Sequence, residues 1–249
     1  ALRPATKLKS RLHHMLEKEI LRLFESVAVV SEVGGFCVRL DTRPIKTPEA
    51  RALLFPSKAL ADLVATEWSV QEVEIKPLTM PLMRLACTAI DKVTPVRADV
   101  IQQLSLYGIS DLLCYRAERP DDLVTLQHKS WQPILDWMEQ TNKVPLNVTS
   151  GIIHVSQPDD TIDKLTALID VYDDFMIAGL GEITQLTGSL ALGLATVERL
   201  IDGHFAFEAS QIDDDWQTEQ WGKDMEAVVR RNNLEADIKF ATKFLDALI

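Results

Sequence analysis

The side chains with the clearest chemical potential form an acidic cluster at Asp213, Asp214 and Asp215. Neighbouring carboxylates can act as general acid and general base, so a hydrolase-like enzyme that uses the cluster Asp213–Asp215 is one hypothesis. The other is the start of a helix, with Asp213 or Asp214 as its cap and all three acids favoured by the helix dipole. An enzyme also needs a pocket with more convergent polar groups, so composition favours the helix start.

The residues that follow the acids, Trp216, Gln217 and Trp221, add a third possibility, in which one acid contacts another protein. Aromatic side chains are favoured anchors at protein interfaces. Tryptophans on the apolar stripe of a helix normally belong to the core, and this pattern favours the core for Trp68 and Trp131. Both the core and a contact surface remain open for Trp216 and Trp221.

Motifs for bound cofactors fail at their defining positions. The segment Gly188–Gly193 has the glycine spacing of a phosphate-binding loop, but Leu194 and Ala195 stand where lysine and a hydroxyl residue are needed. The five histidines form no pair with the H-x-x-x-H spacing of a metal site, and no G-x-S-x-G elbow occurs. We therefore predict no cofactor, no metal site and no catalytic residue.

Composition restricts the class of partner. Apolar residues make up 47% and charged residues 25% of the 249 residues, the profile of an ordinary soluble globular protein. A formal net charge of -11 makes the chain a poor non-specific binder of nucleic acid or anionic lipid, because each phosphate contact needs a cation. No uninterrupted apolar run reaches the roughly 18 residues of a membrane span, so we expect no stable membrane insertion.

The three cysteines, Cys37, Cys87 and Cys114, have apolar neighbours and no close spacing. They are expected to be small buried hydrophobes, with neither a disulfide framework nor a zinc knuckle. Such cysteines fit a reducing compartment.

The hydrophobic period divides the chain into two parts. Within residues 27–55, alternating apolar residues around the turn signal Gly34–Gly35 predict a hairpin, followed by short strands at Ile45–Thr47 and Ala52–Phe55. After Ser57 the period becomes 3.6, which indicates helices. The predicted fold class is therefore α+β. A small N-terminal antiparallel β domain precedes a larger, mainly α-helical C-terminal domain.

The domain boundary is expected in the proline-containing stretch near residues 70–80. The N-terminal β domain with its flanking helices then covers residues 1–75, and the C-terminal helical domain covers residues 76–249. Short extended links are expected at Leu112–Tyr115 and Gly151–Val155.

Three helical predictions are specific enough to test. The start of the chain, Leu2–Leu23, is basic and amphipathic and predicts a surface helix. The segment Thr184–Val197 is apolar on nearly every face, which predicts a single central helix buried all round. A last long helix is expected from about Lys223 to Leu248. Further helices are expected to begin near Ser57, Leu82, Pro95, Asp121 and Asp159 or Asp160.

An ordered set of motifs resembles the family of assembly chaperones for the alpha subunit of F-type ATP synthase. Gly35–Pro48, with the sequence GFCVRLDTRPIKTP, is similar to that family's N-terminal motif, and Asp213–Gln217, with the sequence DDDWQ, is similar to its D-E-x-x-Q motif. The other matching stretches are Ala65–Trp68, Met80–Asp91, Asp111–Ala117 with Gln127, Trp131 and Trp137, Gly188–Leu190, and Trp221–Gly222. The resemblance extends from about residue 24 to the C-terminus.

The resemblance implies a chaperone without catalysis or cofactor that binds the free alpha subunit, prevents its aggregation and hands it over to the beta subunit. It implies a partner-binding site at Asp213, Asp214, Trp216, Gln217 and Trp221. Asp214 stands where the family has a functional acid, typically glutamate, so the carboxylate is one methylene shorter here.

The expected partner is therefore the alpha subunit, with no nucleic acid, and the free protein is expected to be a monomer. The family implies the alphaproteobacterial cytoplasm, or the mitochondrial matrix for a processed chain. The alternatives are the hydrolase-like enzyme and a generic helical scaffold with another partner.

Overall fold

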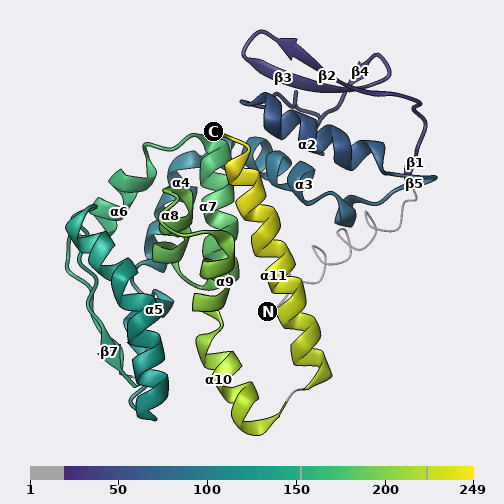
Figure 1. Ribbon diagram of the computed structural model, residues 1–249. Helices are drawn as coiled ribbons and strands as arrows, with labels where there is room; N and C mark the ends of the chain where they lie inside the picture. Colours follow the sequence, from purple (N-terminus) through teal and green to yellow (C-terminus); the bar gives the residue numbers. More distant parts are fainter. Residues whose placement is uncertain (1–19, 152, 223) are drawn as a thin grey trace, which may run out of the picture.

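The structure is a computed structural model that describes residues 20–249 except residues 152 and 223. The fold is α+β, as the sequence predicts: small antiparallel sheets near the N-terminus precede a helical C-terminal region. Figure 1 shows the strands β2, β3 and β4 gathered at one end, over the helix α2, with the remaining helices grouped beside and below them.

The predicted hairpin is confirmed. Strand β2 (Val27–Glu32) pairs antiparallel with β3 (Gly35–Leu40), and Gly34 turns between them with a φ of 92° that favours glycine. Strand β4 (Arg43–Pro44) adds a short third strand to β3. The sheet packs against α2 (Lys58–Ser69). A hairpin alone is marginally stable in water, so this packing stabilises it.

The two further strands predicted at residues 45–47 and 52–55 are reduced to single bridges, Lys46↔Ala52 and Phe36↔Phe55. A tight turn explains the difference. The Ala50 amide donates to the Thr47 carbonyl (2.8 Å), and Ala50 has a φ of 61°, so the chain reverses before a ladder can form.

The prediction of one central helix over residues 184–197 is wrong. Two helices, α7 (Asp174–Thr187) and α8 (Leu190–Val197), meet at Gly188, which has a left-handed φ of 69°. Glycine ends the first helix at low steric cost, and Ser189 caps the second by accepting from the Leu192 amide (3.0 Å). The predicted burial holds, because every residue of α8 is buried.

The buried start of α8 depends on Asp111, whose side chain is fully buried. Its carboxylate accepts from Ser189 Oγ (2.7 Å), from the Ala191 amide (3.0 Å) and from the Leu113 amide (3.0 Å). Burial raises the pKa of this carboxyl, while the donors around it act in the opposite direction. These bonds replace the water that an exposed helix start would use.

Most of the other helices lie close to the predicted positions. The π-helical turn at Ala89–Val93 continues the helix predicted from near Leu82. The helix α9 (Gly203–Ser210) and the part of α7 before Thr184 have no counterpart in the sequence prediction. The remaining helical elements are Pro77–Thr79, α3 (Pro81–Thr88), Thr94–Val96, α4 (Arg97–Tyr107), Leu112–Cys114, α5 (Asp121–Gln140), α6 (Thr161–Ile169), α10 (Ile212–Trp221) and α11 (Met225–Asp246).

Two segments predicted as extended or helical differ locally. Leu112–Cys114 is a turn of 3-10 helix, capped by Asp111, instead of an extended link, and only Tyr115–Arg116 (β6) is a strand, paired in parallel with β7 (Thr149–Ser150). Of the helix predicted at 2–23, residues 1–19 lie outside the described part of the chain. Ile20–Leu21 form strand β1, because their backbone pairs with β5 (Glu74–Ile75).

All three cysteines are free and buried, as predicted. Burial raises the pKa of the Cys87 and Cys114 thiols to about 12, and it raises the pKa of Cys37 as well. Trp131 is completely buried and donates from Nε1 to the Ala209 carbonyl (2.8 Å), which confirms its core position. In the described part of the chain, no helix has the length and apolarity that crossing a membrane requires.

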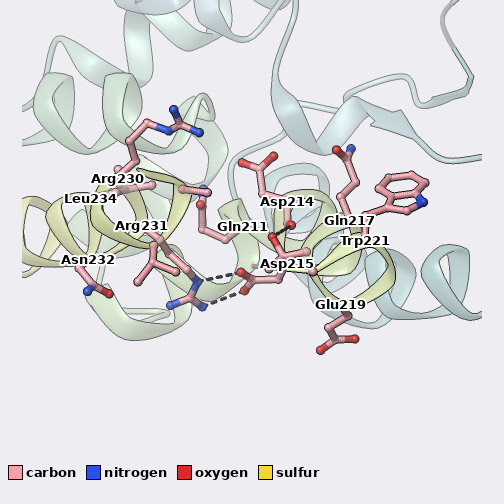
Figure 2. Close-up of a pocket in the computed structure, with 14 residues that line it drawn as sticks. Gln211, Asp214, Asp215, Gln217, Glu219, Trp221, Arg230, Arg231, Asn232 and Leu234 are labelled. Carbon is pink, nitrogen blue, oxygen red and sulfur yellow. Dashed lines mark hydrogen bonds and ion pairs between the residues drawn. The ribbon is translucent and has the colours of Figure 1, made fainter. Parts of the chain in front are cut away.

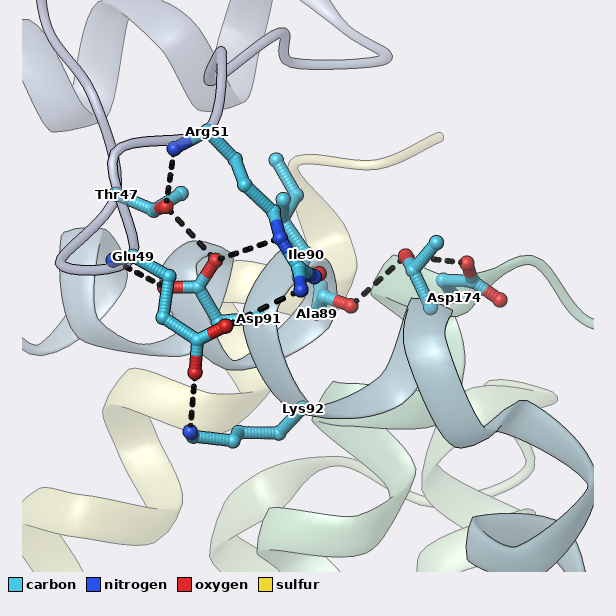
Figure 3. Close-up of polar contacts among 9 residues, drawn as sticks. Thr47, Glu49, Arg51, Ala89, Ile90, Asp91, Lys92 and Asp174 are labelled. Carbon is cyan, nitrogen blue, oxygen red and sulfur yellow. Dashed lines mark hydrogen bonds and ion pairs between the residues drawn. The ribbon is translucent and has the colours of Figure 1, made fainter.

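A polar clamp joins the strand region to the helices (Figure 3). Asp91, in the π-helical turn, is 6% exposed and accepts from Thr47 Oγ1 (2.7 Å) and from the Glu49 amide (3.1 Å). Arg51 donates from Nη1 to the Ile90 carbonyl (2.8 Å) beside it. The loop that follows β4 is therefore fixed to the end of α3.

Replacement of Asp91 by alanine should reduce the free energy of unfolding by about 2 kcal/mol, because the Thr47 hydroxyl and the Glu49 amide lose their buried acceptor. Urea denaturation followed by circular dichroism measures the change. The control Glu49→Gln removes only ion pairs between exposed side chains, which contribute little, and should behave like the wild type. Equal stability of the two variants would contradict the clamp.

Substitutions at Gly188 should rank by their tolerance of a left-handed backbone, because a Cβ atom there would meet nothing within 4 Å. Gly188→Asn should cost only a few tenths of a kcal/mol, and Gly188→Val about 1–2 kcal/mol, in the free energy of unfolding. Urea midpoints of the two variants measure this order. A similar loss for both would show that the backbone conformation of Gly188 is not the determinant.

Candidate functional site

The acidic cluster lies in the first turn of α10. The helix-start prediction is confirmed, but the predicted cap is wrong. Gln211 occupies the cap position without a side-chain bond, and Asp213, Asp214 and Asp215 follow inside the helix. Their carboxylates there still oppose the positive end of the helix dipole. Adjacent positions on a helix are about 100° apart, so the three carboxylates face different directions.

One face of α10 packs inward on α5 and α9. Ile212 is buried, and Trp216 packs against the hydrophobic core. Asp213 Oδ1 accepts from Gln127 Nε2 (2.6 Å), and Gln127 Oε1 accepts from the Ala117 amide (2.9 Å). Burial raises the pKa of the Asp213 carboxyl, the bond from Gln127 lowers it, and the nearby charge of Asp214 raises it. This face holds the helix in place.

Asp215 points in a second direction and binds Arg231 of α11 (Figure 2). Both carboxylate oxygens accept from the guanidinium, at 2.7 Å from Nε and 2.8 Å from Nη2. Arg231 also donates to Glu208 (3.1 Å) and stacks over the ring of Phe207, 4.5 Å from its centroid. The bonds to Asp215 raise the pKa of Arg231 further, so this cation fixes α10 relative to α9 and α11.

The outer face of α10 carries Asp214, Gln217, Thr218 and Trp221, which are spaced by three, four and seven residues from the first and so share one side of the helix. Trp221 is 81% exposed. Figure 2 shows Asp214 and Gln217 extending from α10, with Trp221 at its end. These side chains form one wall of a cleft of about 970 Å³.

The opposite wall is the first part of α11, where Ala227, Val228 and Leu234 supply the apolar lining. The buried residues of α11, from Ile238 to Leu245, all lie in its second half. Figure 1 shows the first half of α11 running away from the helical body toward its connection with α10. The cleft lies between these two helices.

The sequence-predicted site residues divide between the two faces. Asp214, Gln217 and Trp221 line the cleft, whereas Asp213 and Trp216 point to the packed side. The sequence prediction missed the α11 wall, although the helix expected from residue 223 starts directly after Trp221. It also missed Arg231, whose pairing with Asp215 depends on how two helices meet.

The arrangement offers little for acid–base catalysis. Asp213 is bonded to Gln127 and Asp215 to Arg231, and these carboxylates do not converge with Asp214 on one point. The described residues hold no group of three or more histidine, cysteine, aspartate or glutamate side chains placed to bind a metal ion. The cleft combines an exposed indole with acidic and apolar side chains.

Comparison with known proteins gives concordant similarities. A family model described as ATP12 chaperone protein matches residues 21–139. The crystal structure of Atp12 from Paracoccus denitrificans is 38% identical to this chain, with a TM-score of 0.88, and the match covers 92% of this chain and 99% of that one.

Two further solved structures are similar. A point mutant of Atp12p from P. denitrificans is 37% identical, with a TM-score of 0.88, over 93% of this chain and 100% of that one. A chaperone candidate from Agrobacterium tumefaciens is 36% identical, with a TM-score of 0.86, over 92% of this chain and 86% of that one.

The inner face of α10 gives a testable prediction at Asp213. Asp213→Ala should reduce the free energy of unfolding by about 1–2 kcal/mol, because the buried Gln127 amide loses its acceptor. Asp213→Asn retains an acceptor oxygen and should stay close to the wild type. Urea denaturation of both variants measures the difference. If Asp213→Asn were as unstable as Asp213→Ala, the negative charge of Asp213 and not its acceptor oxygen would hold α10.

Proposed function

The chain belongs to the ATP12 chaperone family, and on that premise we propose that it is an assembly chaperone of the F-type ATP synthase that binds the free alpha subunit. In this function it prevents aggregation of the alpha subunit and hands the subunit over for assembly with the beta subunit. The motif set Gly35–Pro48 to Trp221–Gly222 in the sequence supports this choice of partner.

The physical need for such a protein follows from the geometry of rings. A ring subunit without its neighbours exposes large apolar interfaces, and exposed apolar patches are aggregation hazards. A chaperone must cover such an interface tightly enough to protect it and weakly enough to be displaced. An open cleft with few anchors suits reversible binding better than a deep enclosed pocket does.

We place the contact at the outer face of α10, and the exposure of Trp221 is the observation that carries this proposal. A tryptophan side chain that is 81% exposed gains a large apolar contact area when a partner covers it. Asp214 and Gln217 lie beside it on the same face. Among the five residues expected at the partner site, Asp213 and Trp216 then act by holding α10 in position.

The same proposal includes a monomeric free protein, with a β domain in residues 1–75 and a helical domain in residues 76–249. The bacterial organisms of the similar structures support action in the bacterial cytoplasm. A processed chain in the mitochondrial matrix is the alternative compartment.

Trp221→Ala should weaken binding of purified alpha subunit by about thirtyfold, the effect of losing an interface anchor worth about 2 kcal/mol. It should leave the urea midpoint unchanged, because the side chain is exposed. Biolayer interferometry measures affinity, and light scattering of the isolated alpha subunit measures protection from aggregation. Val33→Ala is the matched control, because Val33 is a 99% exposed apolar residue at the hairpin turn.

The outcomes separate two claims. Failure of the wild-type protein to bind the alpha subunit, or to suppress its aggregation, would refute the chaperone function proposed for that partner. Wild-type affinity of Trp221→Ala, together with normal binding by the wild type, would leave the function intact and move the contact away from the cleft.

A further inference from the structure

One arginine that lines the cleft, Arg231, is itself bound by other side chains of the protein. Two kinds of group hold Arg231. The carboxylate of Asp215 accepts two hydrogen bonds from it, at 2.7 Å and 2.8 Å, and its guanidinium carbon lies 4.5 Å from the centroid of the Phe207 ring. A guanidinium satisfies both, because it donates two parallel hydrogen bonds and stacks by its flat face.

The outer face of α10 carries the same two kinds of group, but they are seven residues apart and hold no cation of the described residues. Asp214 supplies a carboxylate and Trp221 supplies an aromatic ring, and both are exposed in the cleft. Within the described residues, no cation forms an ion pair with Asp214. An uncompensated carboxylate is suited to a cation that another molecule brings, and an exposed indole on the same helix face is suited to an apolar side chain of that molecule.

The remaining charges of the cleft favour the same sign of ligand. Its two arginines are engaged, Arg231 with Asp215 and Arg230 with Glu226 (3.0 Å). Glu219 adds a second exposed carboxylate to the lining, and no cation of the described residues pairs with it. Among the described residues that line the cleft, the charge available to a partner is therefore negative, while Ala227, Val228 and Leu234 make the facing wall apolar.

From these features we infer that the cleft binds a basic, amphipathic segment of the alpha subunit, which places an arginine at Asp214 and an apolar side chain at Trp221. This inference rests on the proposed function. Asp214 and Trp221 are seven residues apart, or about 10 Å along the helix axis. The two side chains of the partner segment are therefore separated by about seven residues in a helix or about three in a strand.

Arginine is preferred over lysine at this position for a geometric reason. A guanidinium can engage both oxygens of Asp214, as Arg231 engages those of Asp215, whereas an ammonium makes a point contact. Short overlapping peptides from the alpha subunit, probed with the full-length wild-type chain, should yield binders with an arginine and an apolar residue at this spacing. Arginine to lysine replacement in the strongest peptide should weaken binding, and arginine to glutamine should weaken it more.

The decisive experiment compares Asp214→Asn with Glu235→Gln against the intact alpha subunit. Both variants lose one negative charge from an exposed side chain, but Glu235 of α11 does not line the cleft. Asp214→Asn should weaken binding by about tenfold or more, and Glu235→Gln by less than about twofold. Asp214→Arg should bind poorly, and a strongest peptide with arginine replaced by glutamate should restore its binding.

Three results overturn the inference while leaving the chaperone function intact. The first is wild-type affinity of Asp214→Asn for the intact alpha subunit, and the second is an equal loss in Asp214→Asn and Glu235→Gln. The third is a set of strongest peptides without a basic residue. A wild-type protein that does not bind the intact alpha subunit would instead refute the proposed function, and the inference with it.

Discussion

A helix that is buried on every side must satisfy its terminal amides without water, and α8 is such a helix. Asp111 and Ser189 supply the acceptors at its start, so two segments distant in the sequence meet at one buried point. Five helices among the described residues pack on the sides of α8: α4, α5, α7, α9 and α11. The positions of these five helices therefore depend on a polar junction inside an apolar core.

The candidate site is built at the edge of this body. Helices α5 and α9 form the platform on which α10 rests, through Ile212, Trp216 and the bond between Asp213 and Gln127. Arg231 then sets the position of α11 relative to α10. The residues that hold α10 are thus interleaved with those that face solvent, and neighbours in the chain perform unlike tasks. A helix that is fixed on its inner face and open to solvent on its outer face can present a preformed contact surface.

Local patterns in the sequence were sufficient where one element decides its own structure. The hairpin around Gly34 follows from alternation and a turn signal, and the helices α5 and α11 follow from their apolar period. The pattern failed at residues 184–197, because burial made both helices uniformly apolar and hid the break at Gly188. It also could not assign adjacent acids to different faces of α10. That assignment depends on Gln127 and Arg231, which reach the helix only in the folded chain.

The burial of the three cysteines makes the native thiols of the folded protein unreactive toward thiol-modifying reagents. Thiolate is the species that reacts with maleimides and iodoacetamide, and desolvation keeps Cys37, Cys87 and Cys114 in the neutral thiol form at neutral pH. A single cysteine introduced on the solvent side of α10 would then be the one reactive sulfur of the folded protein. The native thiols need not be removed before a photo-crosslinker or a fluorophore is attached there, so the wild-type core stays unaltered during such labelling.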